Sequence, residues 1–440
     1  MAPHVIVVGA GFGGLEVARR LAHEPVRVTL LDRRNYHLFQ PLLYQVATGA
    51  LNPSDIAYPT RAAFVHDRNV RVLLGEVTAI DTAARKITLE AGELHYDYLV
   101  LAAGSTDSYF GHDEWRGLAP GMKSIEDAVE IRRRVYLAYE AAEREADRAR
   151  QRDWLTFVVV GGGPTGVELA GAFGEIGLQT LAADFRSIDS RSVRVVLCEG
   201  KERVLMAYPA RLSAAAKHSL EQRHVDVRLD AMVTAIDETG VTVTTKAGSE
   251  RIGARTVVWA AGVKASPLTA QLGAPLDRGG RVIVAPDLSV PGHPNVFAIG
   301  DLAKMESDGA EVPGVAQGAI QGGHHVAKII AAEATADASD QPRPKRAAFR
   351  YRDKGNMATI GRGEAVVATK RVAIHGFFAW LLWWAVHIYF LVGFRSRVLV
   401  MASWAWSWVT FKRGARLITG RVGPLPAIDD SISDSGPPAP

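Results

Sequence analysis

The sequence predicts an α/β protein with two doubly wound units, because one strand–glycine–helix pattern occurs twice along its 440 residues. The first copy is the apolar run Val5–Val8 followed by the glycine-rich run Gly9–Gly14. The second is Phe157–Val160 followed by Gly161–Gly166. Glycines in the G-x-G-x-x-G spacing allow a tight turn and a close approach of backbone to a pyrophosphate, which the following helix N-terminus attracts. Two such Rossmann-like units predict two bound dinucleotides.

The first copy continues as a dinucleotide-binding unit should. A second apolar run, Val26–Leu31, ends at Asp32, which lies 23 residues after Gly9. A carboxylate about 20 residues after the first glycine accepts hydrogen bonds from ribose hydroxyls. We therefore expect one dinucleotide to bind across Gly9–Gly14 and Asp32.

The second copy has a longer spacing. Its second strand, Val193–Cys198, ends at Glu199, 38 residues after Gly161. We expect an extended helix and loop over residues 173–192 to absorb the difference. A carboxylate at this strand end repels a 2′-phosphate and favours NADH over NADPH, although two nearby basic residues leave the preference open.

The composition indicates a folded, enzyme-sized protein of two or three domains. Hydrophobic residues make up 48% of the chain, and the formal net charge of +4 gives no indication of nucleic-acid binding. The single cysteine, Cys198, excludes an intramolecular disulfide and a C-x-x-C redox pair, so we expect a small buried strand residue there. His324 and His325 have no partners at metal-ligand spacing, so no metal site is expected. The early glycine loop leaves no room for a signal peptide, which predicts that the first unit stays in the cytosol.

The remaining patterns divide the chain into five parts. A long helix, Ser124–Arg152, carries charges of alternating sign that predict a solvated face. The strand-like run Asn295–Asp301 returns the chain to the first unit, and a polar linker at 334–346 precedes a C-terminal module. The expected parts are a first dinucleotide-binding domain (1–115 and 271–335), a second one inserted in it (116–270), a C-terminal helical module (345–421) and a disordered tail (422–440).

The C-terminal module is basic and rich in tryptophan. No acidic residue occurs between Glu364 and Asp429, whereas this stretch holds eight basic residues and six of the nine tryptophans. Tryptophan prefers the headgroup boundary of a bilayer, and each basic side chain near an anionic leaflet contributes about 1 kcal/mol. We therefore expect the module to anchor the protein to an anionic lipid surface. The residues are Lys370, Arg371, Arg395, Arg397, Lys412, Arg413, Arg416 and Arg421, with Trp380, Trp383, Trp384, Trp404, Trp406 and Trp408.

Two apolar segments of this module predict how it meets the membrane. Phe377–Gly393 has 17 residues, the lower limit for a spanning helix, and we interpret it as embedded or buried in a dimer rather than spanning. In the next segment a narrow polar stripe interrupts an apolar helix, which is typical of a helix lying in the membrane interface, with a buried core or dimer helix as the alternative. The stripe consists of Ser396, Ser403, Ser407 and Thr410.

Together these motifs resemble the two-dinucleotide-binding flavoprotein superfamily. The strand Tyr96–Gly104, its echo Val257–Gly262 and the late Phe297–Asp301 follow the order of that superfamily. The resemblance implies that the N-terminal loop holds FAD and the inserted loop holds NADH. It also places Glu168 near the meeting point of nicotinamide and flavin, although an ordinary glutamate on the helix surface is the competing interpretation. The implied FAD residues are Gly9, Gly11, Gly13, Gly14, Asp32, Ala103, Gly104, Asp301, Ala316 and Gln317, and the implied NADH residues are Gly161, Gly163, Pro164, Thr165, Gly166, Glu199 and Gly262.

The helix after Pro313 indicates the electron acceptor. Gln317 and Gln321 are four residues apart, so both amides lie on one helix face and can hydrogen-bond a carbonyl. The run Ala316–Gln321 resembles the Ala-Gln-x-Ala-x-Gln quinone motif of type II NADH dehydrogenases. With one cysteine in the chain, a dithiol cannot carry electrons, so they leave the flavin directly. The expected catalytic residues are Glu168, Gln317 and Gln321.

The resemblance as a whole implies a non-proton-pumping NADH:quinone oxidoreductase on the cytoplasmic face of the inner membrane. It implies a homodimer that uses ubiquinone or menaquinone, FAD and NADH. Tyr36–Tyr44 and Thr48–Ser54 also resemble the family's segment beside the flavin, though loop packing explains them equally well. Two alternatives stay open. A soluble NAD(P)H-dependent ferredoxin or rubredoxin reductase should lack the tryptophan-rich tail, and a flavin-based redox sensor or scaffold predicts negligible quinone turnover.

Overall fold

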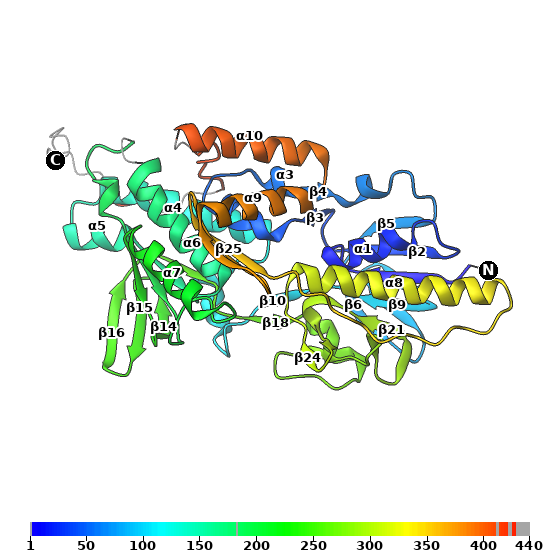
Figure 1. The fold of residues 1–440 in the computed structure, drawn as a ribbon. Helices are drawn as coiled ribbons and strands as arrows, with labels where there is room; N and C mark the ends of the chain where they lie inside the picture. The colour runs from blue at the N-terminus through cyan, green and yellow to red at the C-terminus, as the bar shows by residue number, and fades with distance from the viewer. Residues whose placement is uncertain (1, 182–183, 411–412, 421–424, 428–440) are drawn as a thin grey trace. The chain divides into compact units, whose positions relative to one another are not determined.

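The computed structural model describes residues 2–181, 184–410, 413–420 and 425–427, and they form two compact units. Unit 1 contains the described residues of Met1–Leu38, Ala57–Thr106 and Val263–Lys354 (Figure 1). Unit 2 contains those of Phe39–Ile56, Asp107–Gly262 and Gly355–Pro440. Residues 39–56, which lie inside the predicted first domain, therefore belong to unit 2. Lys412, Arg421 and most of the predicted tail at 422–440 lie outside the described residues.

Unit 1 is built around a six-stranded sheet in the order β20-β21-β9-β1-β2-β5. All neighbouring pairs are parallel except β20 with β21. Both faces of a parallel sheet are covered, which explains why β1 and β9 are continuous apolar runs without alternation. The strands are β1 (His4–Val8), β2 (Arg27–Asp32), β5 (Val70–Leu74), β9 (Tyr98–Leu101), β20 (Ser289–Val290) and β21 (His293–Ala298).

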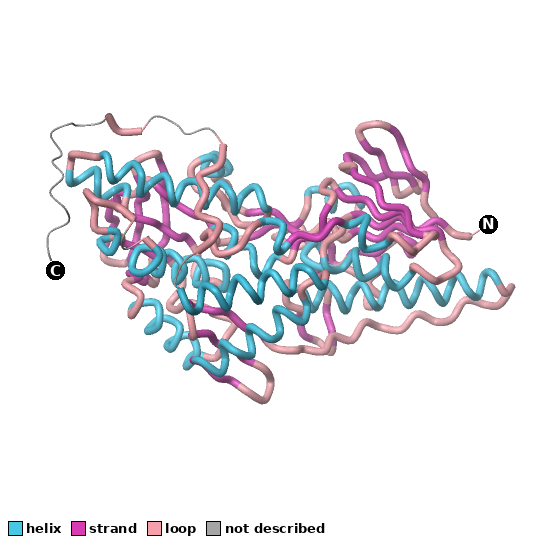
Figure 2. The backbone as a smooth tube through the Cα atoms, turned by 90° about the horizontal axis from the view of Figure 1, so that it is seen from above, coloured by secondary structure: helices cyan, strands magenta, loops and turns pink. Residues whose placement is uncertain are grey.

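Two helices of unit 1 pack along each other. They are α1 (Phe12–Leu21), which follows the first glycine loop, and α8 (Ala316–Ala338). The helix predicted after Pro313 is confirmed, but it continues through the first residues of the predicted linker. Beyond α8 the chain turns back and runs beside it, as Figures 1 and 2 show, and Arg346 Nε there donates to Glu333 Oε1 at 2.5 Å.

Unit 2 repeats the pattern with a four-stranded parallel sheet in the order β13-β12-β11-β17. Its strands are β11 (Thr156–Val160), β12 (Arg194–Cys198), β13 (Val225–Arg228) and β17 (Thr256–Trp259), and its helices include α6 (Pro164–Glu175) and α7 (Ala210–Glu221). Cys198 is buried in β12, as predicted, and burial raises the pKa of its thiol to about 12.

Each unit also carries a three-stranded antiparallel sheet. One consists of β6 (Val77–Asp81), β7 (Lys86–Leu89) and β8 (Gly92–His95), the other of β14 (Met232–Asp237), β15 (Gly240–Thr245) and β16 (Gly248–Gly253). The other short strands are β3 (Tyr36–Leu38), β4 (Ala57–Pro59), β10 (Ser105–Asp107), β18 (Val263–Ala265), β19 (Val282–Ile283), β22 (Ala303–Lys304), β23 (Glu306–Ser307) and β24 (Ala310–Glu311).

The predicted long helix at 124–152 is two helices, α4 (Ile125–Arg144) and α5 (Arg148–Trp154). The Ser124 side chain caps α4 in a reciprocal capping box with Asp127. The prediction of a single helix is wrong because Asp147 caps a new helix, its carboxylate accepting from the backbone N–H groups of the second and third following residues. The face is also not fully solvated, since Arg132 is buried.

The C-terminal part of unit 2 is not only helical. A three-stranded antiparallel sheet precedes two helices, and it consists of β25 (Asn356–Gly361), β26 (Glu364–Ala368) and β27 (Ala373–Gly376). The two helices are α9 (Phe377–Phe390) and α10 (Phe394–Thr410). Residues 39–56 add two short helices, α2 (Leu43–Ala47) and α3 (Pro53–Ile56). The prediction of a purely helical module is thus wrong, because these short strands pair into a sheet whose buried middle residues pack it against α6. Among the described residues, no helix has the length and hydropathy needed to cross a membrane.

The polar stripe of α10 faces the protein. Ser396 and Val400 are buried, whereas Val398, Trp406 and Val409 are exposed. The helix packs against α3 and α9, while Val398, Trp406 and Val409 stay exposed. α9 also buries only one side, because its buried residues Ala379, Trp383 and His387 are four residues apart and lie on one face of the helix.

Candidate functional site

The first glycine loop of unit 1 has the geometry of an anion cradle. Gly9 has a φ of +103°, and a Cβ on Gly14 would overlap the carbonyl oxygen of Gly9, so both positions require glycine. A Cβ on Gly13 would lie 3.1 Å from the Ala319 carbonyl oxygen of α8. No side chain caps α1, and a Cβ on Gly11 would meet no atom within 4 Å. Uncapped N–H groups beside open space fit the pyrophosphate of a dinucleotide.

The carboxylate at the end of β2 is fixed against this loop. Asp32 Oδ2 accepts from the Ala10 N–H at 2.6 Å, and Oδ1 accepts from the Arg34 N–H at 2.7 Å. The loop and the predicted ribose-binding carboxylate are therefore held in one arrangement.

The late Gly-Asp motif lies at the end of β21. Gly300 has a φ of +72°, and Asp301 Oδ2 accepts from the Ser105 hydroxyl at 2.9 Å. Ser105 follows Ala103 and Gly104, the loop after β9, and the φ of Gly104 is +68°. Two of the predicted FAD segments thus meet through one hydrogen bond.

The second loop, in unit 2, repeats the first in detail. Gly161 has a φ of +108°, and a Cβ on Gly166 would overlap the Gly161 carbonyl oxygen. Gly163 precedes α6, Pro164 is its first residue and Thr165 its second, and no side chain caps the helix. A Cβ on Gly163 would meet no atom within 4 Å, so this loop also fits a pyrophosphate.

Glu199 takes the place in unit 2 that Asp32 has in unit 1. Its Oε2 accepts from the Gly162 N–H at 2.6 Å. The long spacing is absorbed by a π-helical turn, Ile176–Thr180, and a 3₁₀ turn, Ser190–Ser192, between α6 and β12. After the end of β17, the Phe110 ring packs against Gly262. A Cβ on Gly262 would lie only 2.5 Å from Phe110 Cζ.

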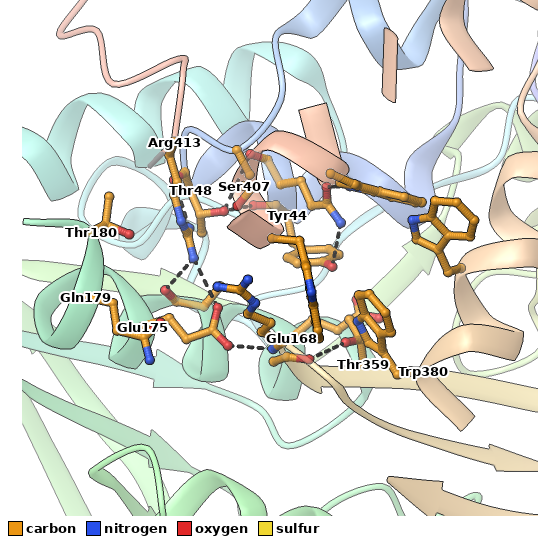
Figure 3. Close-up of a pocket in the computed structure, with 18 of the residues that line it drawn as sticks. Tyr44, Thr48, Glu168, Glu175, Gln179, Thr180, Thr359, Trp380, Ser407 and Arg413 are labelled. Carbon is orange, nitrogen blue, oxygen red and sulfur yellow. Dashed lines mark hydrogen bonds and ion pairs between the residues drawn. The ribbon is translucent and has the colours of Figure 1, made fainter. Parts of the chain in front are cut away.

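A separate pocket lies entirely within unit 2 (Figure 3). One wall is formed by five tryptophans of α9 and α10, and Trp383 among them is only 2% exposed. The sequence-based assignment of all six C-terminal tryptophans to the headgroup boundary did not include this pocket, and Trp408 both lines the pocket and is 40% exposed. Trp406 does not line the pocket and is 63% exposed. The five are Trp380, Trp383, Trp384, Trp404 and Trp408.

The opposite wall of the pocket is polar. Arg413 donates to the Thr48 carbonyl oxygen at 2.9 Å and forms an ion pair with Glu175 at 3.4 Å. Glu175 Oε1 also accepts from the backbone N–H of Arg362 at 2.6 Å, and the Arg362 guanidinium lies 4.3 Å from the centre of the Trp408 ring. These pairs tie the segment after α10 to α6 and to the β25–β26 turn.

Glu168 of α6 lines the pocket between these walls. Burial raises the pKa of Glu168 from 4.5 to about 8, and the backbone N–H of Thr359, which donates to the carboxylate, opposes this rise. At neutral pH the side chain is therefore mostly protonated and can donate a hydrogen bond. This environment argues against an ordinary glutamate on the helix surface.

The two glutamines of α8 have different surroundings. Gln321 is paired with the backbone of Arg352, donating to its carbonyl oxygen at 3.0 Å and accepting from its N–H at 2.9 Å. Gln317, next to Ala316 in the first turn of α8, is half-buried, and its amide has no hydrogen-bond partner among the described residues. One amide therefore holds the chain that runs back along α8, while the other is available to a ligand.

Sequence reasoning did not find the pocket. Gln45, Thr359 and Arg413 line it but stand in no motif, and their stretches meet only through tertiary packing. The only partial signal was that the segment resembling the family's ends at Tyr44, which lines the pocket.

Comparison with known proteins identifies the class. Residues 3–323 match the pyridine nucleotide-disulphide oxidoreductase family, and the chain belongs to it. Within that class it belongs with the type II NADH:quinone oxidoreductases. NdhA of Mycobacterium tuberculosis, so named, is 46% identical over 428 residues, covering 95% of this chain and 90% of the relative. A Staphylococcus haemolyticus protein of the same name is 31% identical, covering 82% and 88%.

The fold is also that of a solved relative. The structure of NDH2 from Plasmodium falciparum in complex with NADH superimposes with a TM-score of 0.84 at 20% sequence identity, covering 94% of this chain and 99% of that one. The predicted α/β fold class is thereby confirmed.

Proposed function

We propose that the protein oxidises NADH and passes two electrons through FAD to a membrane quinone without pumping protons. The observation that carries this proposal is the 46% identity, along 95% of the chain, to a protein named type II NADH:quinone oxidoreductase. The chain's single cysteine, buried in β12, supports direct transfer from flavin to quinone, since no dithiol can be formed within it.

FAD is assigned to unit 1 and NADH to unit 2. Gly9–Gly14 would hold the FAD pyrophosphate, Asp32 its ribose, and Asp301, Gly104 and Ala103 the flavin half. Gly161–Gly166 and Glu199 would hold NADH in the same way, with Gly262 on the nicotinamide side of the sheet. FAD, when bound, supplies two-electron redox chemistry between the nucleotide and the acceptor.

Two features fit a quinone and are assigned separately: the Gln317 amide in unit 1, and the tryptophan-lined pocket in unit 2. The Gln317 amide would bind a quinone carbonyl, while Gln321 positions the backbone of Arg352. Glu168, protonated at neutral pH, is a donor for the reacting groups. These residues bind and orient, so positioning supplies most of their contribution to rate.

Attachment to the cytoplasmic face of the inner membrane is assigned to the outer faces of α9 and α10. Phe378, Phe394 and Val409 are 77%, 82% and 77% exposed, and large apolar side chains exposed on these two helices favour a lipid partner. Arg395 beside them would contact anionic headgroups.

The test is NADH oxidation by the purified full-length protein. We expect rapid turnover with menadione and with a short-chain ubiquinone, flavin absorbance that bleaches with NADH, and no transfer to ferredoxin or rubredoxin. Flavin reduction followed by transfer only to an iron–sulfur or iron carrier protein would refute the proposal, and so would an absence of turnover with both quinones.

A further inference from the structure

A chain of hydrogen bonds runs along the pocket wall from α10 to α2. Trp404 Nε1 donates to Gln45 Oε1 at 2.6 Å, and Gln45 Nε2 donates to the Tyr44 hydroxyl oxygen at 2.8 Å. The directions follow from chemistry. An indole N–H can only donate, so the Gln45 atom facing it is the amide oxygen. The atom facing Tyr44 is then the amide nitrogen, which also only donates, so the Tyr44 oxygen must accept.

The hydrogen of the Tyr44 hydroxyl therefore points away from Gln45. Tyr44 is only 8% exposed and borders the pocket, yet this hydrogen has no acceptor among the described residues. The hydroxyl hydrogen therefore borders the pocket as an unused donor, and a ligand there that offers an acceptor would gain a hydrogen bond. Burial, together with the nearby Glu168 carboxylate, raises the pKa of Tyr44 well above its usual value, so the hydroxyl keeps its hydrogen.

We propose that the Tyr44 hydroxyl donates a hydrogen bond to a carbonyl oxygen of the quinone ring held in the tryptophan-lined pocket, and that Trp404, through Gln45, keeps that hydrogen pointing at the quinone. This inference rests on the proposed function and names a donor within its acceptor site. A quinone oxygen carries lone pairs only, so it matches a donor, and its flat ring matches indole surfaces. The hydroxyl oxygen of the reduced ring is a weaker acceptor, which favours product release.

The first test removes the donor alone. Tyr44→Phe keeps the ring and should raise the KM for menadione by about 2- to 10-fold, the loss of one neutral hydrogen bond. The rate of flavin reduction by NADH, the KM for NADH and the FAD content should stay at wild-type values. Direct binding of oxidised menadione, measured by calorimetry without NADH, should weaken by the same factor.

The second test asks whether Trp404 acts through Tyr44. Trp404→Phe removes the indole N–H, so the Gln45 amide can reverse and capture the Tyr44 hydrogen with its oxygen. Trp384→Phe is the matched control, because Trp384 lines the same pocket and packs on Trp404 at 5.7 Å between ring centres, but has no bond to Gln45. Trp404→Phe should raise the menadione KM beyond the control, and this excess should vanish when Tyr44 is already phenylalanine.

The outcomes distinguish a failure of the proposed function from a failure of the Tyr44 assignment. Wild-type protein that fails to turn over either quinone overturns the proposed function itself. Normal wild-type turnover, with unchanged menadione KM and binding in folded, FAD-loaded Tyr44→Phe, overturns only the Tyr44 assignment. A rise in the KM for NADH instead would place the nicotinamide carboxamide at Tyr44 and also overturn it. If Trp404→Phe and Tyr44→Phe raise the menadione KM by independent factors that multiply in the double variant, Trp404 does not orient the Tyr44 hydrogen.

Discussion

Replacing Glu168 with glutamine should change how the stability of the protein depends on pH. The pKa of Glu168 is raised from 4.5 to about 8 by burial. Between these values the unfolded chain is ionised at this residue while the folded chain holds the proton. Folding then takes up a proton, so the free energy of unfolding falls as pH rises, by up to about 1.4 kcal/mol per pH unit from this one group. Below pH 4.5 and above pH 8 its contribution is flat.

The measurement is urea unfolding of wild-type and Glu168→Gln proteins at pH 5.5, 6.5 and 7.5. Other groups titrate equally in both proteins, so the difference between the two curves isolates Glu168. We expect the variant to gain stability relative to wild type at each step, with the gain levelling off near pH 8. Parallel curves over this range would show that the carboxyl is already ionised in the folded protein and would refute the reasoning.

Four further changes test the cofactor and membrane assignments. Gln317→Leu should slow flavin reoxidation by menadione in stopped-flow spectra and leave flavin reduction by NADH unchanged. If neither half-reaction changes, Gln317 does not bind the quinone. Asp32→Asn loses a charge-assisted bond to the glycine loop and should weaken FAD retention by about 10- to 100-fold, read from flavin absorbance after gel filtration. Glu199→Ala should raise the KM for NADH about 10-fold and that for NADPH less, and equal rises would contradict a ribose contact. Val409→Asp should reduce co-sedimentation with anionic vesicles while menadione turnover is kept; Ala247→Asp, in the exposed turn after β15, is the control, and equal loss in both would point to charge alone.

The glycine loops and their carboxylates were predictable because their information is local. Gly9 and Asp32 are separated by one helix and one strand, whereas the longer segment between Gly161 and Glu199 made the second carboxylate harder to assign. A short window of sequence is enough to show an apolar strand, a glycine that permits a positive φ and a carboxylate at the end of a strand. The break between α4 and α5 was missed because Asp147 acts as a cap, and a charged helix pattern does not distinguish a cap from a surface aspartate.

The pocket and the membership of residues 39–56 in unit 2 were not predictable in this way. Tyr44 and Trp404 lie about 360 positions apart, and nothing in either neighbourhood indicates that they share a wall. The tryptophans were assigned to a lipid surface from composition alone. Composition shows that indoles are abundant, but it does not show whether they face lipid headgroups or a cavity in the protein. An indole facing a lined cavity satisfies the same preference as one facing lipid headgroups.

The outward apolar side of α10 also affects how the isolated protein behaves. Ser396 and Val400 are buried while Phe394 and Val409 are exposed, so turning the helix about its axis to cover Phe394 and Val409 would expose Ser396 and Val400. In water this surface can be covered only by detergent or by another copy. We expect the particle size in light scattering to depend on detergent concentration, with a uniform species above the critical micelle concentration and growing aggregates below it.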